Sequence, residues 1–155
     1  MFKTEIEYEN YKGVETTETF YFHLGKGELM EYVMIMGGDP ITRIDILSKE
    51  GKTGEIVDLF KDLIRRSYGI PDPETGRFIK SKESLNDFVY SGAFDATFFR
   101  MASDTDFTTN FVNNVFPESI RKKLEESGLG APSEQGEAPT LNRAMRRAME
   151  REQKD

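Results

Sequence analysis

Hydrophobic and polar positions alternate at the start of the chain. Phe2, Ile6 and Tyr8 are separated by charged residues, which is the pattern of a β-strand with one buried face. Residues 10–13 (Asn-Tyr-Lys-Gly) supply a turn, and a return strand rich in threonine and aromatic residues follows. The pattern predicts a β-hairpin over residues 1–24. Because an isolated two-stranded hairpin is marginally stable, we expect it to pack on helices or to pair with another chain.

After Gly27 the spacing changes to that of helices. Apolar residues recur at intervals of three and four, which predicts a helical domain over residues 25–128. Ser81 and Asp104 stand where helix N-caps are expected. Residues 70–77, rich in Pro, Asp and Gly, are expected to form a loop. The fold class is therefore mainly α, a helical bundle with an N-terminal β-hairpin (α+β by content).

The composition shifts near the end of the sequence. Residues 129–139 contain almost nothing to bury, which predicts a flexible linker. Residues 140–155 place Leu141 and Met145 on one side and arginines around the others, which predicts a basic amphipathic helix in a flexible C-terminal tail. This helix could be a frayed end, a docking helix for a partner, or a contact with nucleic acid or membrane. Its acidic residues argue against the last two.

Composition narrows the classes of function. The 155 residues carry 21 basic and 28 acidic side chains, a net charge of −7, so we predict no nucleic-acid binding. No stretch reaches the length of an apolar membrane span, and the N-terminus lacks the apolar segment of a secretory signal. No membrane association is expected, and the chain has an intracellular character. The absence of cysteine excludes disulfides, thiol catalysis and cysteine-based metal sites.

Candidate chemical groups are few. The single histidine, His23, ends an aromatic strand, and no nucleophile-elbow sequence accompanies it. Glu5, Glu7 and Glu9 alternate as on a solvated strand face, rather than as a catalytic pair. The Asp-x-Glu-x-Gly sequence at residues 72–76 lacks the further ligands of a calcium loop. We predict no catalytic residue, no cofactor and no metal site.

Methionines and phenylalanines are unusually dense in two segments. Met30, Met34 and Met36 lie close together in the first helical segment, and six phenylalanines fall between residues 94 and 116. Core packing accounts for most of them. The alternative for the remainder is an adaptable apolar surface that binds other polypeptides.

Five blocks of the sequence occur in an order typical of one protein family. They are YKGVETTETFYF leading into GELME (11–31), IVDLFKDLIRRSYG (56–69), GRFIK (76–80), FDATFF through FVNNVFP (94–117), and LNRA with RRA (141–148). On these blocks the chain resembles the tail assembly chaperones of siphophages that infect Gram-positive bacteria. The resemblance covers nearly the whole chain, and its motifs are packing and turn patterns rather than a chemical fingerprint.

The resemblance implies a chaperone that is made during virion assembly. Such a protein coats the tape measure protein, keeps it soluble and helps to recruit the major tail protein. It works in the host cytoplasm, is absent from the finished virion, and is commonly accompanied by a longer frameshifted form. Because an unpaired strand edge can pair between copies, we also expect a homo-oligomer.

The same resemblance implies that some of these apolar residues contact a partner protein. Met30, Met34, Phe94 and Phe98 are the candidates for contact with the tape measure protein. Leu141 and Met145 are the candidates on the C-terminal helix.

Two other classes of function remain open. A structural tail component, such as a connector or tube-associated protein, would be retained in the virion. A small hydrolase would use His23 with a carboxylate, and it would lose its activity on His23→Ala.

Overall fold

The computed structural model describes residues 1–116 and 122. The predicted linker (129–139) and C-terminal helix (140–155), with Leu141 and Met145, lie outside the described residues. The described residues divide into two compact units, which we call the first unit (residues 1–24 and 52–115) and the second unit (residues 25–51, 116 and 122). The predicted domain boundaries stay predictions.

The N-terminal hairpin is present as the alternation predicts. Strands β1 (Phe2–Glu9) and β2 (Glu15–Phe22) pair antiparallel over their whole length. In the turn, the Gly13 N–H donates to the Asn10 carbonyl at 2.9 Å, and the Asn10 side chain accepts from the Val14 N–H at 3.1 Å. Gly13 has a φ of 76°, in the left-handed region that favours glycine.

The two faces of the hairpin differ sharply. Ile6, Phe20 and Phe22 are buried on one face, and helices α5 (Gly92–Ser103) and α6 (Thr105–Val115) pack against β1. The opposite face is exposed and carries four glutamates: Glu5, Glu7, Glu9 and Glu15. The hairpin thus packs on helices, which is one of the two solutions that its marginal stability required.

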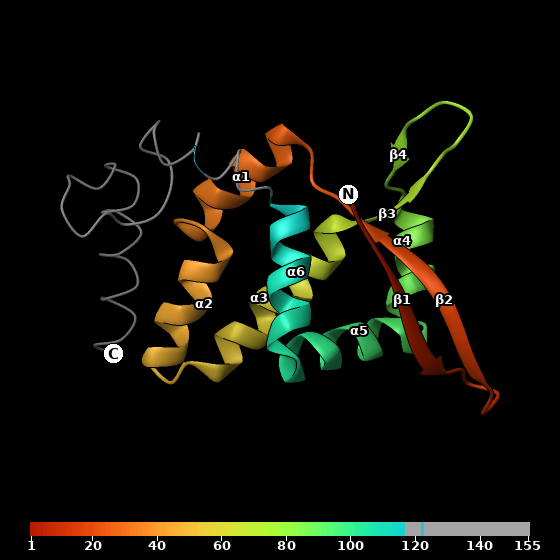
Figure 1. Ribbon diagram of the computed structural model, residues 1–155, viewed down its shortest axis with the longest axis horizontal. Helices are drawn as coiled ribbons and strands as arrows, with labels where there is room; N and C mark the ends of the chain where they lie inside the picture. Colours follow the sequence, from red (N-terminus) through yellow and green to blue (C-terminus); the bar gives the residue numbers. More distant parts are fainter. Residues whose placement is uncertain (117–121, 123–155) are drawn as a thin grey trace. The chain divides into compact units, whose positions relative to one another are not determined.

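The sheet is larger than the hairpin. Strand β3 (Tyr68–Pro71) pairs with β2, and β4 (Phe78–Ile79) pairs with β3, giving the antiparallel order β1-β2-β3-β4 (Figure 1). The predicted loop over residues 70–77 is therefore wrong at its start, because Ile70 and Pro71 belong to β3. These strands are very short, and local Pro and Gly signals outweigh the weak strand pattern that two paired residues leave in a sequence.

Between β3 and β4 the chain does turn. The Gly76 N–H donates to the Asp72 carbonyl at 2.9 Å, and the Asp72 carboxylate accepts from the Thr75 hydroxyl at 2.8 Å and the Glu74 N–H at 3.0 Å. These hydrogen bonds, that from Thr75 foremost, hold the pKa of Asp72 below its usual value. The sequence Asp-x-Glu-x-Gly is thus a turn motif.

Helices α3 (Thr53–Ser67) and α4 (Lys82–Val89) complete the first unit. Ser81 caps the N-terminus of α4, where its hydroxyl accepts from the Ser84 N–H at 3.1 Å. Asp104 caps the N-terminus of α6, where its carboxylate accepts from the Phe107 N–H at 3.1 Å. Both predicted N-caps are confirmed.

Aromatic rings dominate the core of the first unit. Phe22 is fully buried, with ring centroids 5.0 Å from Phe111, 5.9 Å from Phe88 and 6.1 Å from Tyr68. The Tyr68 and Phe88 rings stack at 4.2 Å. Many of the phenylalanines in the sequence therefore pack the sheet against the helices.

The second unit contains helices α1 (Lys26–Met36) and α2 (Pro40–Lys49), which pack together. The Glu28 carboxylate accepts from the Gly25 N–H at 3.1 Å at the start of α1, and the Asp39 carboxylate accepts from the Ile41 N–H at 3.0 Å at the start of α2. The Tyr32 ring lies 5.4 Å from that of Phe116.

Gly92→Ala is expected to lower the free energy of unfolding by about 1–3 kcal/mol, the usual cost of forcing an atom into a packed site. A Cβ on Gly92 would lie 2.7 Å from the Glu9 carbonyl oxygen and 3.0 Å from the Tyr8 ring, and the backbone of β1 cannot rotate away. The matched control is Gly54→Ala, where a Cβ would meet open space. Urea unfolding measures both, and equal stability of the two variants would contradict the prediction.

Candidate protein-binding surfaces

Helix α1 is apolar around most of its circumference. Leu29, Tyr32 and Val33 are buried, but Met30, Met34 and Ile35 remain 41%, 38% and 44% exposed. A helix packed on one side covers only the residues of that side, so an apolar helix of this kind keeps apolar side chains exposed.

The two predicted methionines lie on one flank of α1. Met30 and Met34 are four residues apart, and therefore one helical turn apart on the same flank. Their thioethers are flexible and polarisable, which suits contact with varied apolar side chains. Ile35 of α1 is also exposed, and so is Ile41 of the neighbouring helix α2. Neither isoleucine was predicted from the sequence, although for Ile35 the run Leu-Met-Glu-Tyr-Val-Met-Ile-Met (29–36), with one charge in eight residues, carries the signal.

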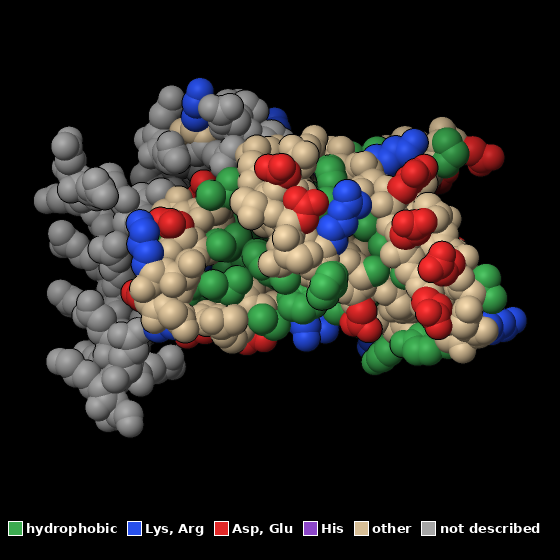
Figure 2. Space-filling view, turned by 60° about the horizontal axis from the view of Figure 1, so that its bottom comes forward, with side chains coloured by type: hydrophobic (Ala, Val, Ile, Leu, Met, Phe, Trp, Pro, Cys, Tyr) green, Lys and Arg blue, Asp and Glu red, His purple; other side chains and the backbone are tan. Residues whose placement is uncertain are grey.

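The phenylalanines of α5 divide into buried and exposed members. Phe94 is only 4% exposed, with its ring centroid 5.7 Å from that of Phe88, so in this conformation it offers a partner almost no surface. Phe98 is half-buried, with the Lys61 ammonium 5.2 Å from its ring, whereas Phe99 is 72% exposed. Figure 2 shows hydrophobic side chains among charged ones on one face of the molecule.

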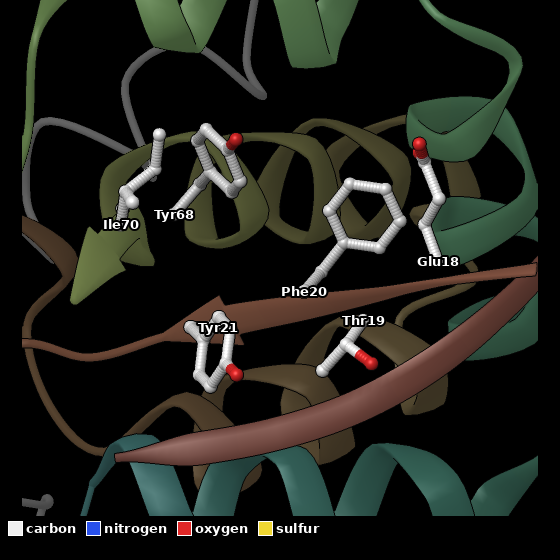
Figure 3. A pocket seen from close by; sticks show the side chains of 7 residues that line it. Glu18, Thr19, Phe20, Tyr21, Tyr68 and Ile70 are labelled. Atoms are coloured by element: carbon white, nitrogen blue, oxygen red, sulfur yellow. The ribbon is translucent and has the colours of Figure 1, made fainter. Parts of the chain in front are cut away.

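A groove opens where β3 leaves β2. The two strands pair only at Tyr21 with Gly69 and at Phe22 with Tyr68, and beyond these pairs lies a cavity of about 400 Å³. Figure 3 shows its lining residues, with Phe20, Tyr68 and Ile70 on one side of β2 and Thr19 and Tyr21 on the other. We call this cavity the β2–β3 groove; Glu18 and Gly69 complete its lining.

Glu18 at this groove is tied to β1. The Tyr8 hydroxyl donates to the Glu18 carboxylate at 2.6 Å, and this hydrogen bond, with desolvation and the negative charge of Glu18, raises the pKa of Tyr8 from 10.0 to about 12. The bond joins the two strands on the face that meets the helices.

Tyr8 is expected to ionise only near pH 12 in the folded protein, whereas the unfolded chain loses this proton near pH 10. Because the folded-state pKa is the higher one, the stabilisation is complete below pH 10 and is lost as the pH rises through 12. Phenolate absorbance measures the titration. Glu18→Gln should return one tyrosine to its usual range, and Tyr8→Phe should remove that same transition; a titration unaltered by Glu18→Gln would contradict the assignment.

His23 lies at the end of β2, beside β3 and β4. The backbone N–H of His23 donates to the Ser67 carbonyl at 2.7 Å, and the centroid of its ring lies 5.6 Å from that of Phe78. The nearby Ser67 hydroxyl is buried and donates to the Leu63 carbonyl at 2.6 Å, so its hydrogen is not directed at the imidazole.

Among residues 1–116 and 122, no group of three or more His, Cys, Asp or Glu side chains could hold a metal ion. No helix within these residues is long and apolar enough to cross a bilayer.

The described surfaces hold exposed apolar helix residues, an acidic strand face and an open groove, which are features that suit contact with another polypeptide. The comparison with protein families is consistent with that class: the family model for phage tail assembly chaperones matches residues 1–155, and the chain belongs to this family. Membership of a chaperone family suggests a non-enzymatic role. No match was found among curated proteins or among solved structures.

Proposed function

We propose that this chain coats and solubilises the tape measure protein during tail assembly and helps to recruit the major tail protein. The observation that carries the proposal is the exposed apolar surface of α1, formed by Met30, Met34 and Ile35. The chain would act in the host cytoplasm and be absent from the finished virion.

An exposed flank of this kind suits contact with another helix. Met30 and Met34 repeat at the spacing with which a partner helix presents its own apolar residues. Each contact is small, so one copy binds weakly and can be displaced as the tail tube grows. Many copies along one long helix convert weak contacts into high occupancy.

Repeated binding also requires that the coated complex stays in solution. The net charge of −7 gives each copy the same sign of charge, which opposes aggregation of the coated complex. We infer that a homo-oligomer, with a frameshifted longer form among its copies, makes the coat and brings in major tail protein.

Co-expression with the tape measure gene tests this function. The soluble fraction of tape measure protein should rise strongly when this chain is present, and the two should co-purify. Tape measure protein that is equally soluble without this chain would refute the proposal. Mass spectrometry of purified virions separates the chaperone from a structural tail component, because the chaperone should be absent.

A further inference from the structure

One edge of β2 is open over most of its length. In the ladder with β1, the Asn10 N–H donates to the Val14 carbonyl, so even-numbered residues of β2 bond to β1. On the other side, the His23 N–H donates to the Ser67 carbonyl, so odd-numbered residues face β3. Since β3 pairs only as far as Tyr21, the backbone groups of Thr17 and Thr19 point to an edge that no described strand occupies.

The side chains at this edge differ between the two faces. On the face that meets the helices, Phe20, Tyr68 and Ile70 give the β2–β3 groove apolar surface, and Glu18 lies at one end of it, with its carboxylate accepting from the Tyr8 hydroxyl. On the outer face, Glu15 follows the edge, and β1 adds three exposed glutamates beside it: Glu5, Glu7 and Glu9. An added strand would therefore meet apolar side chains on one face, with the Glu18 carboxylate at one end, and exposed glutamates on the other face.

This arrangement selects the occupant by charge. A second copy pairing through its own β2 would add its own Glu15 and Glu18 to an edge that already carries these two carboxylates, and like charges on adjacent strands are destabilising where they lie close together. A strand that alternates apolar residues with Lys or Arg would match both faces.

We propose that the open edge of β2 binds an extended segment of a tail protein in which apolar residues alternate with Lys or Arg, by adding it as a strand beside Glu15–Phe20. Apolar side chains enter the β2–β3 groove, and basic side chains lie over the glutamates of the outer face. The proposed chaperone function supplies only the class of the partner, a tail protein; the mode of binding follows from the strand edge.

Three synthetic peptides test the mode of binding on the full chain. They are acetyl-Val-Lys-Val-Lys-Val-Lys-Val-amide, its twin with Glu in place of Lys, and a peptide of the first composition with the valines and lysines in separate blocks. Fluorescence anisotropy measures affinity, and amide hydrogen exchange measures protection at Thr17 and Thr19. The alternating basic peptide should bind and protect both amides, and the other two should bind at least about tenfold more weakly.

Variants of residues at the strand edge provide a second test of the same binding mode. Thr19→Pro removes an outward N–H without touching the ladder to β1 and should weaken peptide binding about tenfold, the effect of one lost hydrogen bond. Thr19→Val keeps that N–H and should bind normally. Glu15→Lys should weaken binding about threefold, and Asp58→Lys, the same charge change on α3, should not. Circular dichroism checks that each variant folds.

Three results would overturn the inference: equal binding of the block-order peptide, normal binding by a folded Thr19→Pro, or protection of Thr17 and Thr19 that rises with protein concentration alone. The last would assign the edge to a second copy. If the alternating basic peptide does not bind but the chain still solubilises tape measure protein, this inference is overturned and the proposed function stands. If the peptide binds but the chain does not solubilise tape measure protein, strand addition at the β2–β3 groove is supported and the proposed function is refuted.

Discussion

Replacing Met30 and Met34 together by aspartate is expected to abolish co-purification with the tape measure protein and to leave the fold intact. Both side chains are about two-fifths exposed, so the fold does not depend on burying them. Two carboxylates on one flank of α1 would have to lose their water against an apolar partner helix, which costs several kcal/mol without a compensating hydrogen bond. Affinity purification of co-expressed tape measure protein measures the loss.

The matched control adds the same two charges elsewhere. Asn86→Asp with Asn110→Asp changes two exposed residues on α4 and α6 to near-isosteric carboxylates. This variant should co-purify with tape measure protein as the original chain does. Loss of binding in both double variants would assign the effect to net charge, and retained binding by the methionine variant would remove α1 from the contact surface.

Phe22→Ala is expected to lower the free energy of unfolding by about 3–5 kcal/mol, a large part of the stability of a domain this size. Phe22 is fully buried, and its ring contacts rings from a neighbouring strand and two helices: Tyr68, Phe88 and Phe111. Its removal leaves a cavity where the sheet packs against the helices. Urea unfolding followed by circular dichroism measures the change.

Phe99→Ala provides the comparison for this prediction. The Phe99 ring is 72% exposed, so its removal should change stability by no more than about 0.5 kcal/mol. A similar loss in both variants would mean that Phe22 is not the centre of the aromatic core.

The parts of the fold that were predicted correctly are those with a local physical signal. The hairpin follows from alternation and from a turn that needs a glycine with positive φ. The starts of α4 and α6 follow from Ser81 and Asp104, whose side chains satisfy helix N–H groups within three residues. Each of these signals acts between residues close in the sequence, so a single sequence contains it.

Strands β3 and β4 were missed because their stability comes from distant residues. β3 pairs with β2, more than 40 residues earlier, and the ring of Tyr68 stacks on that of Phe88. Locally the segment shows only the Pro and Gly of a loop. The β2–β3 groove could not be predicted for the same reason, since it exists only where these two strands separate.

The candidate contact residues show the same limit. Helical spacing places Phe94 and Phe98 on one face, but only packing decides that Phe94 lies against Phe88 while Phe99 points to solvent. On α1, the low number of polar residues indicates an incompletely covered helix, and only the structure identifies Ile35 of α1 and Ile41 of α2 as further exposed residues.

The sequence by itself determined the helical class, the hairpin, the helix starts and the surplus of apolar side chains, because alternation, turns and caps are interactions between near neighbours. Only the tertiary structure decided which of those apolar side chains are buried, and that β2 keeps one edge open beside an apolar groove. Burial and strand pairing depend on residues far apart in the chain, and their outcome is fixed only when the elements pack together.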